Sequence, residues 1–250
     1  MKNILRLFTL ITLFALPVKG FSQATEGKIM YKYTIYWNKI YANLEFLSKA
    51  ERDREILTWG NEDGYSTKMS LFFTPKESLY TYATEKENDQ SYSWRKDDYL
   101  IYRNFEENRI KELQEMLGKT YLLEDDLKPY KWRVMNELKE IQGHLCMKAI
   151  TVDTVKKYTI EAWFAADIPV SVGPERLYGL PGAILGVDIN NGDVIIEAEK
   201  IEIRSVAEEL KLPKKLKGKE INLDTYQSLL QEHIKTSKVA QRNPYWAMRF

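Results

Sequence analysis

The sequence predicts a mainly β fold, in which a single antiparallel sheet curls into a bowl or half-barrel and carries short helices and a C-terminal helical extension. Short runs of β-branched and aromatic residues follow one another, each bounded by a turn signal. No helix-length pattern alternates with these runs, as it would in a parallel α/β sheet. Aromatic residues make up 12% of the 250 residues, and such residues favour strands.

The runs expected to form strands share β-branched and aromatic residues in partial alternation, and they are 28–37, 66–74, 77–84, 93–103, 120–125, 132–138, 144–153, 157–164, 184–189 and 193–203. A polar turn is expected at 85–91 between the third and fourth of them. Asn190, Asn191 and Gly192 tolerate positive φ, so they predict a tight turn that pairs the last two runs as a hairpin.

Helical patterns are fewer. Residues 45–57 are charged with scattered apolar positions, which is typical of a surface helix or an ordered excursion. Residues 106–117 read as a short amphipathic segment with helical spacing of Ile110, Leu113, Met116 and Leu117. Near the end, Asn222 or Asp224 can cap a helix. The residues that share its apolar face are Tyr226, Leu229, Leu230, His233 and Ile234.

The chain is expected to divide into a signal peptide over 1–24, an antiparallel β domain over 25–205, and a basic linker, helix and apolar tail over 206–250. Lys2 and Arg6 precede an apolar run from 7 to 18, and Ser22 and Ala24 have signal-peptidase spacing. A buried N-terminal helix is the alternative. The lone cysteine, Cys146, lies far from this run, so the sequence predicts a soluble periplasmic or extracellular protein that is neither a lipoprotein nor membrane-spanning.

Charge and cysteine content exclude two classes. Without residues 1–24, the chain has 34 basic and 36 acidic residues, a formal charge of about −2. Such a surface lacks the basic footprint that nucleic-acid binding needs. One cysteine permits no internal disulfide, so an exported chain of this length depends on its apolar core.

Three runs carry a family resemblance. They are 132–149, with Glu-Ile-Gln-Gly-His-Leu-Cys-Met at 140–147; 161–170, Glu-Ala-Trp-Phe-Ala-Ala-Asp-Ile-Pro-Val; and 173–185, with Gly-Leu-Pro-Gly-Ala-Ile-Leu at 179–185. Together they resemble the GLPGLI family of the Bacteroidetes, exported proteins without an established activity. Ala183 departs from the family motif, which has Leu there. The family is similar to a bowl-shaped β domain attached to a secreted glycan-releasing enzyme, which implies a curled sheet.

The segment 173–182, hereafter the 173–182 loop, concentrates glycine and proline. It does not feed a helix with the Lys and Ser or Thr of a phosphate loop. We interpret it as a rigid corner that sets the sheet register; the alternative is a rim loop that binds a ligand or partner. The candidate binding residues are Gly173, Pro174, Tyr178, Gly179, Leu180, Pro181 and Gly182. In the apolar terminus, Tyr245, Trp246 and Phe250 are candidates for contact with a partner.

Other candidates for chemistry are weaker. Cys146 and His144 are expected on one strand face, as a nucleophile with its base, as ligands of a soft metal, or as a buried thiol beside an unrelated histidine, which is the interpretation we favour. Asp97-Asp98 and Asp125-Asp126 are adjacent, so each pair points to opposite faces of a strand and is expected to be solvated. No metal or cofactor is predicted. Tyrosines could fill the core or line a groove for sugars or peptides: Tyr31, Tyr33, Tyr80, Tyr82 and Tyr99.

The sequence therefore predicts an exported, non-enzymatic binding or assembly component of the bacterial cell envelope. An outer-membrane transporter or surface complex is the expected partner class, on the family resemblance alone, and an apolar or glycan ligand is the expected small ligand. The alternatives are a secreted hydrolase or thiol enzyme that uses Cys146 and His144, and a metal-handling periplasmic protein.

Overall fold

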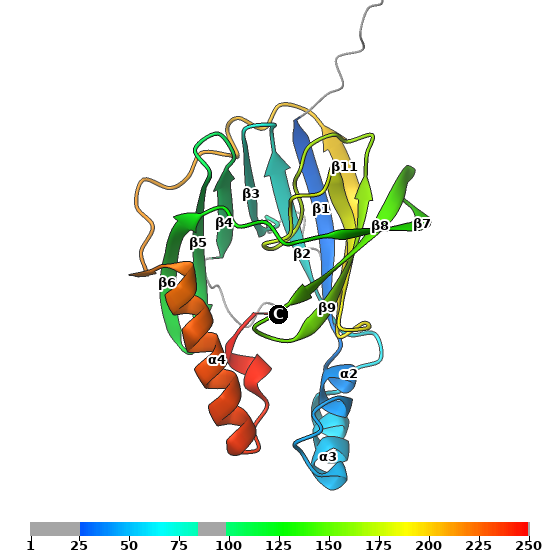
Figure 1. Cartoon of the computed structure of the whole chain (residues 1–250), viewed down its shortest axis with the longest axis vertical. Helices are drawn as coiled ribbons and strands as arrows, with labels where there is room; N and C mark the ends of the chain where they lie inside the picture. The colour runs from blue at the N-terminus through cyan, green and yellow to red at the C-terminus, as the bar shows by residue number, and fades with distance from the viewer. Residues whose placement is uncertain (1–25, 85–98, 250) are drawn as a thin grey trace, which may run out of the picture.

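The computed structural model describes residues 26–84 and 99–249. Twelve strands form one open sheet in the order β12-β6-β5-β4-β3-β2-β1-β11-β10-β9-β8-β7. The strands are β1 Gly27–Ile35, β2 Tyr65–Phe73, β3 Glu77–Tyr82, β4 Leu100–Asn104, β5 Arg109–Met116, β6 Lys119–Asp126, β7 Arg133–Ile141, β8 His144–Asp153, β9 Tyr158–Ala165, β10 Ala183–Ile189, β11 Val194–Ile203 and β12 Lys219–Ile221. The mainly β, curled-sheet prediction is confirmed (Figure 1).

The sheet is mixed rather than wholly antiparallel, which corrects the prediction in one respect. β12 pairs with β6 in parallel, Lys219 opposite Tyr121, while every other neighbouring pair is antiparallel. The cause is the long connection from β11, which crosses the outer face of the sheet. Val206 and Leu210 of this connection are buried there, so the segment expected to be a linker is partly packed.

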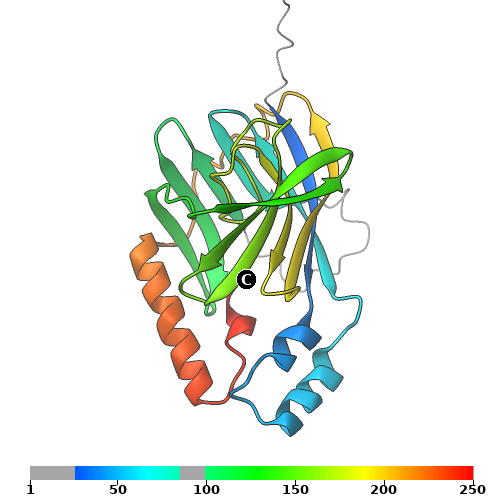
Figure 2. The same ribbon diagram turned by 45° about the vertical axis from the view of Figure 1, so that its right-hand side comes forward.

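Curling gives the sheet a concave face that holds most of the core. The strands β7, β8 and β9 lie in front of β1 to β5, across the concave face of the sheet (Figures 1 and 2). Fully buried side chains of the concave core include Tyr31, Phe73, Tyr80 and Phe164. A smaller cluster covers the outer face and consists of Phe72, Leu79, Leu100, Leu113, Leu122, Val206 and Leu210.

The helices lie at one end of the sheet. α2 (Trp37–Ala42) and α3 (Lys49–Trp59) follow β1. α3 confirms a surface helix in the 45–57 region, because none of its residues is buried and a capping box joins Ser48 and Glu51. Among the helices of the described ranges, none is long and apolar enough to cross a membrane.

The C-terminal helix α4 (Leu223–Val239) begins where the sequence predicts. Asn222 caps it, its Oδ1 accepting the N–H of Thr225 at 2.9 Å. Tyr226 and Leu230 are buried and the other residues of the predicted apolar face are half-buried, so that face is confirmed. A 3-10 helix, η3 (Pro244–Ala247), follows.

The predicted hairpin is confirmed as β10 and β11, with Ile189 opposite Val194. Asn190, Asn191 and Gly192 have φ of 55°, 58° and 90°, the left-handed conformations that these residues tolerate.

The helical interpretation of 106–117 is wrong, because most of this segment is β5. Ile110 and Met116 face the concave core while Leu113 lies in the outer cluster. A strand buried on both faces has apolar side chains without strict alternation, and here their spacing imitates a helix. Of the predicted strand 93–103, the structure contains β4. Residues 93–98 lie outside the described residues, as do the 85–91 turn, the 1–24 leader, Asp97, Asp98 and Phe250.

Candidate binding site in the concave face

The 173–182 loop connects β9 to β10 across the concave interior. Gly173 and Gly182 are at positions where a side chain would collide with backbone: an added Cβ would lie 2.6 Å from the Leu177 carbonyl oxygen and 2.2 Å from the Ala165 carbonyl oxygen, respectively. Of the candidate binding residues in this loop, only Gly179 and Pro181 are exposed. The loop is therefore an internal corner rather than a rim. Binding through it stays a prediction.

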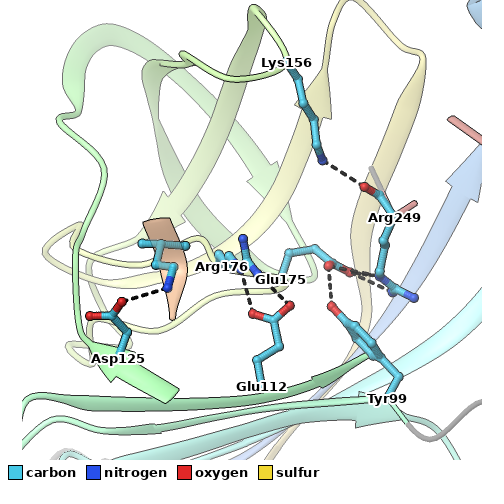
Figure 3. Close-up of polar contacts among 8 residues, drawn as sticks. Tyr99, Glu112, Asp125, Lys156, Glu175, Arg176 and Arg249 are labelled. Carbon is cyan, nitrogen blue, oxygen red and sulfur yellow. Dashed lines mark hydrogen bonds and ion pairs between the residues drawn. The ribbon is translucent and has the colours of Figure 1, made fainter. Parts of the chain in front are cut away.

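Two charges of this loop form ion pairs inside the bowl (Figure 3). Arg176 binds Glu112 of β5 through two bonds, Nε to Oε2 at 2.6 Å and Nη2 to Oε1 at 2.9 Å. Arg249, from the C-terminal tail, donates from Nη2 to Glu175 Oε1 at 2.7 Å. Tyr99 donates its hydroxyl to Glu175 Oε2 at 2.6 Å. Bidentate pairs fix geometry as well as charge, so loop, strand and tail are held in one arrangement.

Aromatic rings surround both arginines. The Arg249 guanidinium carbon lies 3.9 Å from the ring centre of Tyr99 and 4.7 Å from that of Tyr33. That of Arg176 lies 4.2 Å from the ring centre of Tyr226. Cation–π contacts of this kind are strongest where water is excluded. Tyr99 therefore has both roles expected for the tyrosines, because it belongs to the core and also lines a cavity. Tyr31, Tyr33 and Tyr80 are buried in the core.

The ion pairs keep both guanidinium groups charged. Burial alone would lower the pKa of Arg249, but the attraction of Glu175 and the neighbouring phenols hold that pKa above its usual value. The pKa of Arg176 is raised against the same effect of burial by Glu112. Burial raises the pKa of Tyr99 well above its usual value. The site therefore has stable charges and protonated phenols at neutral pH.

A cavity of about 230 Å³ lies beside these pairs. Its polar lining includes Glu112, Gln114, Asp153, Lys156, Tyr178 and Arg176, and its apolar lining includes Ile110, Leu123, Ile160 and Leu177. Lys156 donates its ammonium to the Arg249 carbonyl oxygen at 2.9 Å. Burial lowers the pKa of Lys156 to about 8. On the other side of Arg249, a second hollow of about 580 Å³ lies between β1, β2 and the tail.

The tail packs on the protein itself. Tyr245 is buried, and its ring centre lies 5.7 Å from that of Tyr158. Trp246 is 44% exposed and stacks on Trp37 with ring centres 4.2 Å apart. Contact between the exposed face of Trp246 and a partner stays a prediction. Phe250 lies outside the described residues.

Cys146 and His144 do not form an activated pair. Cys146 is fully buried. Its thiol donates a hydrogen bond to the backbone carbonyl oxygen of His144, at 3.5 Å, and not to the imidazole. The imidazole Nδ1 instead lies 2.8 Å from Asp167 Oδ2. Burial raises the pKa of the thiol to about 11, which keeps it protonated and unreactive.

The acidic pair of β6 is structural. Asp125 Oδ2 accepts the N–H of Leu223 at 2.8 Å and so caps α4, while Asp126 pairs with Arg109 at 2.9 Å. Within residues 26–84 and 99–249, no group of three His, Cys, Asp or Glu side chains is placed to hold a metal ion.

Sequence reasoning missed the charged residues of the site, Glu112, Lys156, Glu175, Arg176 and Arg249. One signal was available: Glu175 and Arg176 are adjacent opposite charges inside an apolar, glycine-rich and proline-rich loop, where solvated charges are not expected. Glu112 and Arg249 gave no such signal, because their partners are 64 and 74 residues away.

Fold and site define a mainly β protein with an open, curled mixed sheet and, on its concave face, a small cavity lined by both apolar and charged side chains. Residues 152–186, which include the Gly179 to Ile184 motif, match the model of a family described as "Protein of unknown function (Porph_ging)". No curated protein matches the chain.

The solved structures of PNGF-II support the fold. Two crystal forms of PNGF-II are similar to this chain, each with a TM-score of 0.52 and 17% identity, over 82% of this chain and 33% or 32% of PNGF-II. The chain thus spans about a third of PNGF-II, and the likeness shows the fold alone. An uncharacterized conserved protein from Thermus thermophilus matches at a TM-score of 0.40 and 5% identity, over 80% of this chain and 91% of that one.

Proposed function

We propose that this protein is an exported, non-enzymatic binding component of the bacterial cell envelope. The observation that carries the proposal is the cavity of about 230 Å³ on the concave face, which is lined by the ion-paired side chains of Arg176 and Arg249. A pre-formed concave site with a few convergent polar groups is the usual form of a small-molecule binding site.

The chemistry of the site favours binding over catalysis. Glu112 and Glu175 are held in bidentate pairs with arginines, so the oxygens of both carboxylates are already engaged as hydrogen-bond acceptors. The alternative of a thiol enzyme or hydrolase is disfavoured by the buried, protonated Cys146, whose thiol donates to the His144 carbonyl oxygen and not to the imidazole.

The family and the location belong to the same proposal. The resemblance to the GLPGLI family rests on 173–185 and its neighbours, and the matched family model overlaps this region. The proposal of export rests on the leader pattern of residues 1–24. An exported protein of this kind would be periplasmic or extracellular.

Assembly with an outer-membrane transporter or surface complex would use surfaces that the fold leaves exposed. Among the described residues, the edge strand β7 pairs with β8 alone, and Leu138 and Leu145 of the β7–β8 hairpin are 60% and 62% exposed. An unpaired edge can accept a strand from a partner. Trp246 offers a second exposed apolar side chain.

The test is cross-linked affinity purification of the full chain from its own host, with a tag placed directly after residue 25, read by mass spectrometry under denaturing and native conditions. We expect a co-purifying small molecule, a stoichiometric envelope protein, or both. Recovery of the protein alone in both readings would contradict the proposal.

Two variants locate the contact. Leu138→Lys should reduce recovery of a partner protein bound at the edge, and Trp246→Ala should reduce recovery of one bound at the tail. Deletion of 243–250 is a poorer test, because it also removes the buried Tyr245 and Arg249. For the enzyme alternative, Cys146→Ala would have to abolish an activity while leaving Tm unchanged.

A further inference from the structure

Three polar groups that line the cavity have hydrogen-bond donors left over. Lys156 Nζ gives one bond, to the Arg249 carbonyl, of the three that an ammonium can give. Gln114 Nε2, which approaches the Tyr226 hydroxyl, and the Tyr178 hydroxyl have no acceptor in hydrogen-bond geometry among the described residues, although the two residues are only 3% and 7% exposed. Buried donors without acceptors cost free energy. The three groups therefore indicate a ligand that supplies acceptor oxygens.

The charges of the cavity wall point to the sign of that ligand. Glu112 and Arg176 neutralise each other, as do Glu175 and Arg249. Lys156, in contrast, forms no ion pair with a carboxylate among the described residues. Lys156 is therefore the cation of the cavity wall whose charge a bound anion can neutralise.

The surroundings of Lys156 support this reading. Asp153, in the same β8–β9 turn, uses Oδ1 to accept the backbone N–H groups of Val155 and Lys156 at 2.8 and 2.9 Å. Burial lowers the pKa of Lys156, and Arg176 acts in the same direction, while Asp153, Glu175 and Glu112 oppose it. A cation destabilised by burial gains from a buried counter-ion.

Size and walls restrict the rest of the ligand. A volume of about 230 Å³ is below the roughly 300–1,000 Å³ of most drug-sized sites. Beyond the polar groups, the walls consist of aliphatic side chains and phenol rings, among them Ile110, Leu123, Tyr130 and Leu230. The ligand therefore has a small, partly apolar body.

We propose that the cavity binds a small organic carboxylate, whose negative charge is held by Lys156 and whose oxygens are acceptors for Gln114 and Tyr178. This inference rests on the proposed binding function and names its ligand class. The remaining two N–H groups of the Lys156 ammonium bind the carboxylate, while its bond to the Arg249 carbonyl stays in place.

The experiment is isothermal titration calorimetry of the full-length mature protein at pH 7 with two matched pairs of probes: benzoate and benzamide, and hexanoate and hexanamide. Inorganic phosphate tests for general anion binding. We expect at least one carboxylate to bind about tenfold or more tightly than its amide, because a charge-assisted bond in a buried site is worth that factor.

Variants assign the effect to the cavity. Lys156→Met should weaken the carboxylate about tenfold or more, and Gln114→Leu should weaken it by a smaller factor. The matched control is Lys157→Met, which removes an exposed lysine beside it and should leave affinity within twofold. Should Lys156→Met fail to fold, Gln114→Leu carries the test.

The opposite results are distinct. An amide that binds as tightly as its acid, with Lys156→Met without effect, overturns the carboxylate class and leaves the binding function standing. Equal binding of phosphate, or no binding by any probe, also overturns the class. The binding function itself fails only when purification from the host recovers neither ligand nor partner.

Discussion

The 173–182 loop and the β7–β8 hairpin are connections within one sheet, but their side chains meet opposite surroundings. In the loop, Glu175 and Arg176 are charged residues drawn into the interior, and each is neutralised by a side chain from a distant element. In the hairpin, Leu138 and Leu145 are apolar residues left in water. Each region is thus an exception to the rule that apolar residues are buried and charged residues are exposed.

The difference separates the two kinds of binding site that we propose for this protein. The loop region is rigid and pre-organised because buried bidentate pairs tolerate little displacement, which suits a small ligand of defined shape. The hairpin presents unpaired backbone groups and apolar side chains, which suits an extended partner.

Among the ion pairs, the largest effect should come from breaking the Glu175–Arg249 pair. Glu175→Gln leaves Arg249 buried without its counter-ion, so we expect the free energy of unfolding to fall by about 3 kcal/mol, measured by urea denaturation. The matched control is Glu208→Gln, which breaks the exposed pair with Lys211 and should cost less than about 0.5 kcal/mol. Equal small losses in both variants would refute the contrast.

Next in size is the glycine comparison between the two regions. Gly182→Ala places a Cβ 2.2 Å from the Ala165 carbonyl oxygen, and such overpacking should cost about 2 kcal/mol. Gly143→Ala, in the β7–β8 turn, meets no atom within 4 Å, but its φ is +79°, which should cost about 1 kcal/mol. Thermal unfolding of the two variants compares them; a larger loss for Gly143→Ala would contradict the tight packing of the loop.

The reactivity of the Cys146 thiol measures whether the β7–β8 hairpin is buried where β8 joins the rest of the sheet. Burial raises the pKa of its thiol from 9.0 to about 11, so at pH 8 the thiolate is about 100-fold scarcer than in the unfolded chain. Alkylation by iodoacetamide should be slower in the native protein by at least that factor than in urea, and faster as pH rises toward 11. Fast native labelling at pH 8 would instead favour the thiol-enzyme alternative.

The same shift has a consequence for stability. Between pH 9 and 11 the unfolded chain loses the Cys146 proton that the folded chain keeps, so the free energy of unfolding from this group falls as pH rises.

The smallest effect is expected at the exposed edge. Leu138→Lys should change the free energy of unfolding by less than about 0.5 kcal/mol, because its side chain is 60% exposed. Ile141→Lys, in the same strand, is the contrast: Ile141 is 4% exposed, and burying a charge there should cost several kcal/mol. Denaturant titration of both variants measures the free energy of unfolding and so shows whether the β7 edge is solvent-exposed at Leu138. A large loss for Leu138→Lys would mean that the edge is covered there.

Much of the architecture was accessible from the sequence. The β10–β11 turn and the start of α4 depend on local rules, positive φ at Asn and Gly and side-chain capping by Asn222, and these were predicted correctly. β5 was not, because a strand with side chains buried on both faces shows no alternation to read. The parallel pairing of β12 was also inaccessible, since it depends on how the connection from β11 crosses the sheet.

The sequence by itself determined the mainly β class, the main hairpin, the C-terminal helix and the glycine positions of the 173–182 loop, because each follows from the properties of neighbouring residues. Only the tertiary structure decided the cavity. Glu112, Glu175, Arg176 and Arg249 acquire their roles by meeting across the curled sheet, and Lys156 acquires its low pKa from burial there. Contacts between residues far apart in the chain leave no periodic trace, so the charges of the site became visible only once the sheet had brought them together.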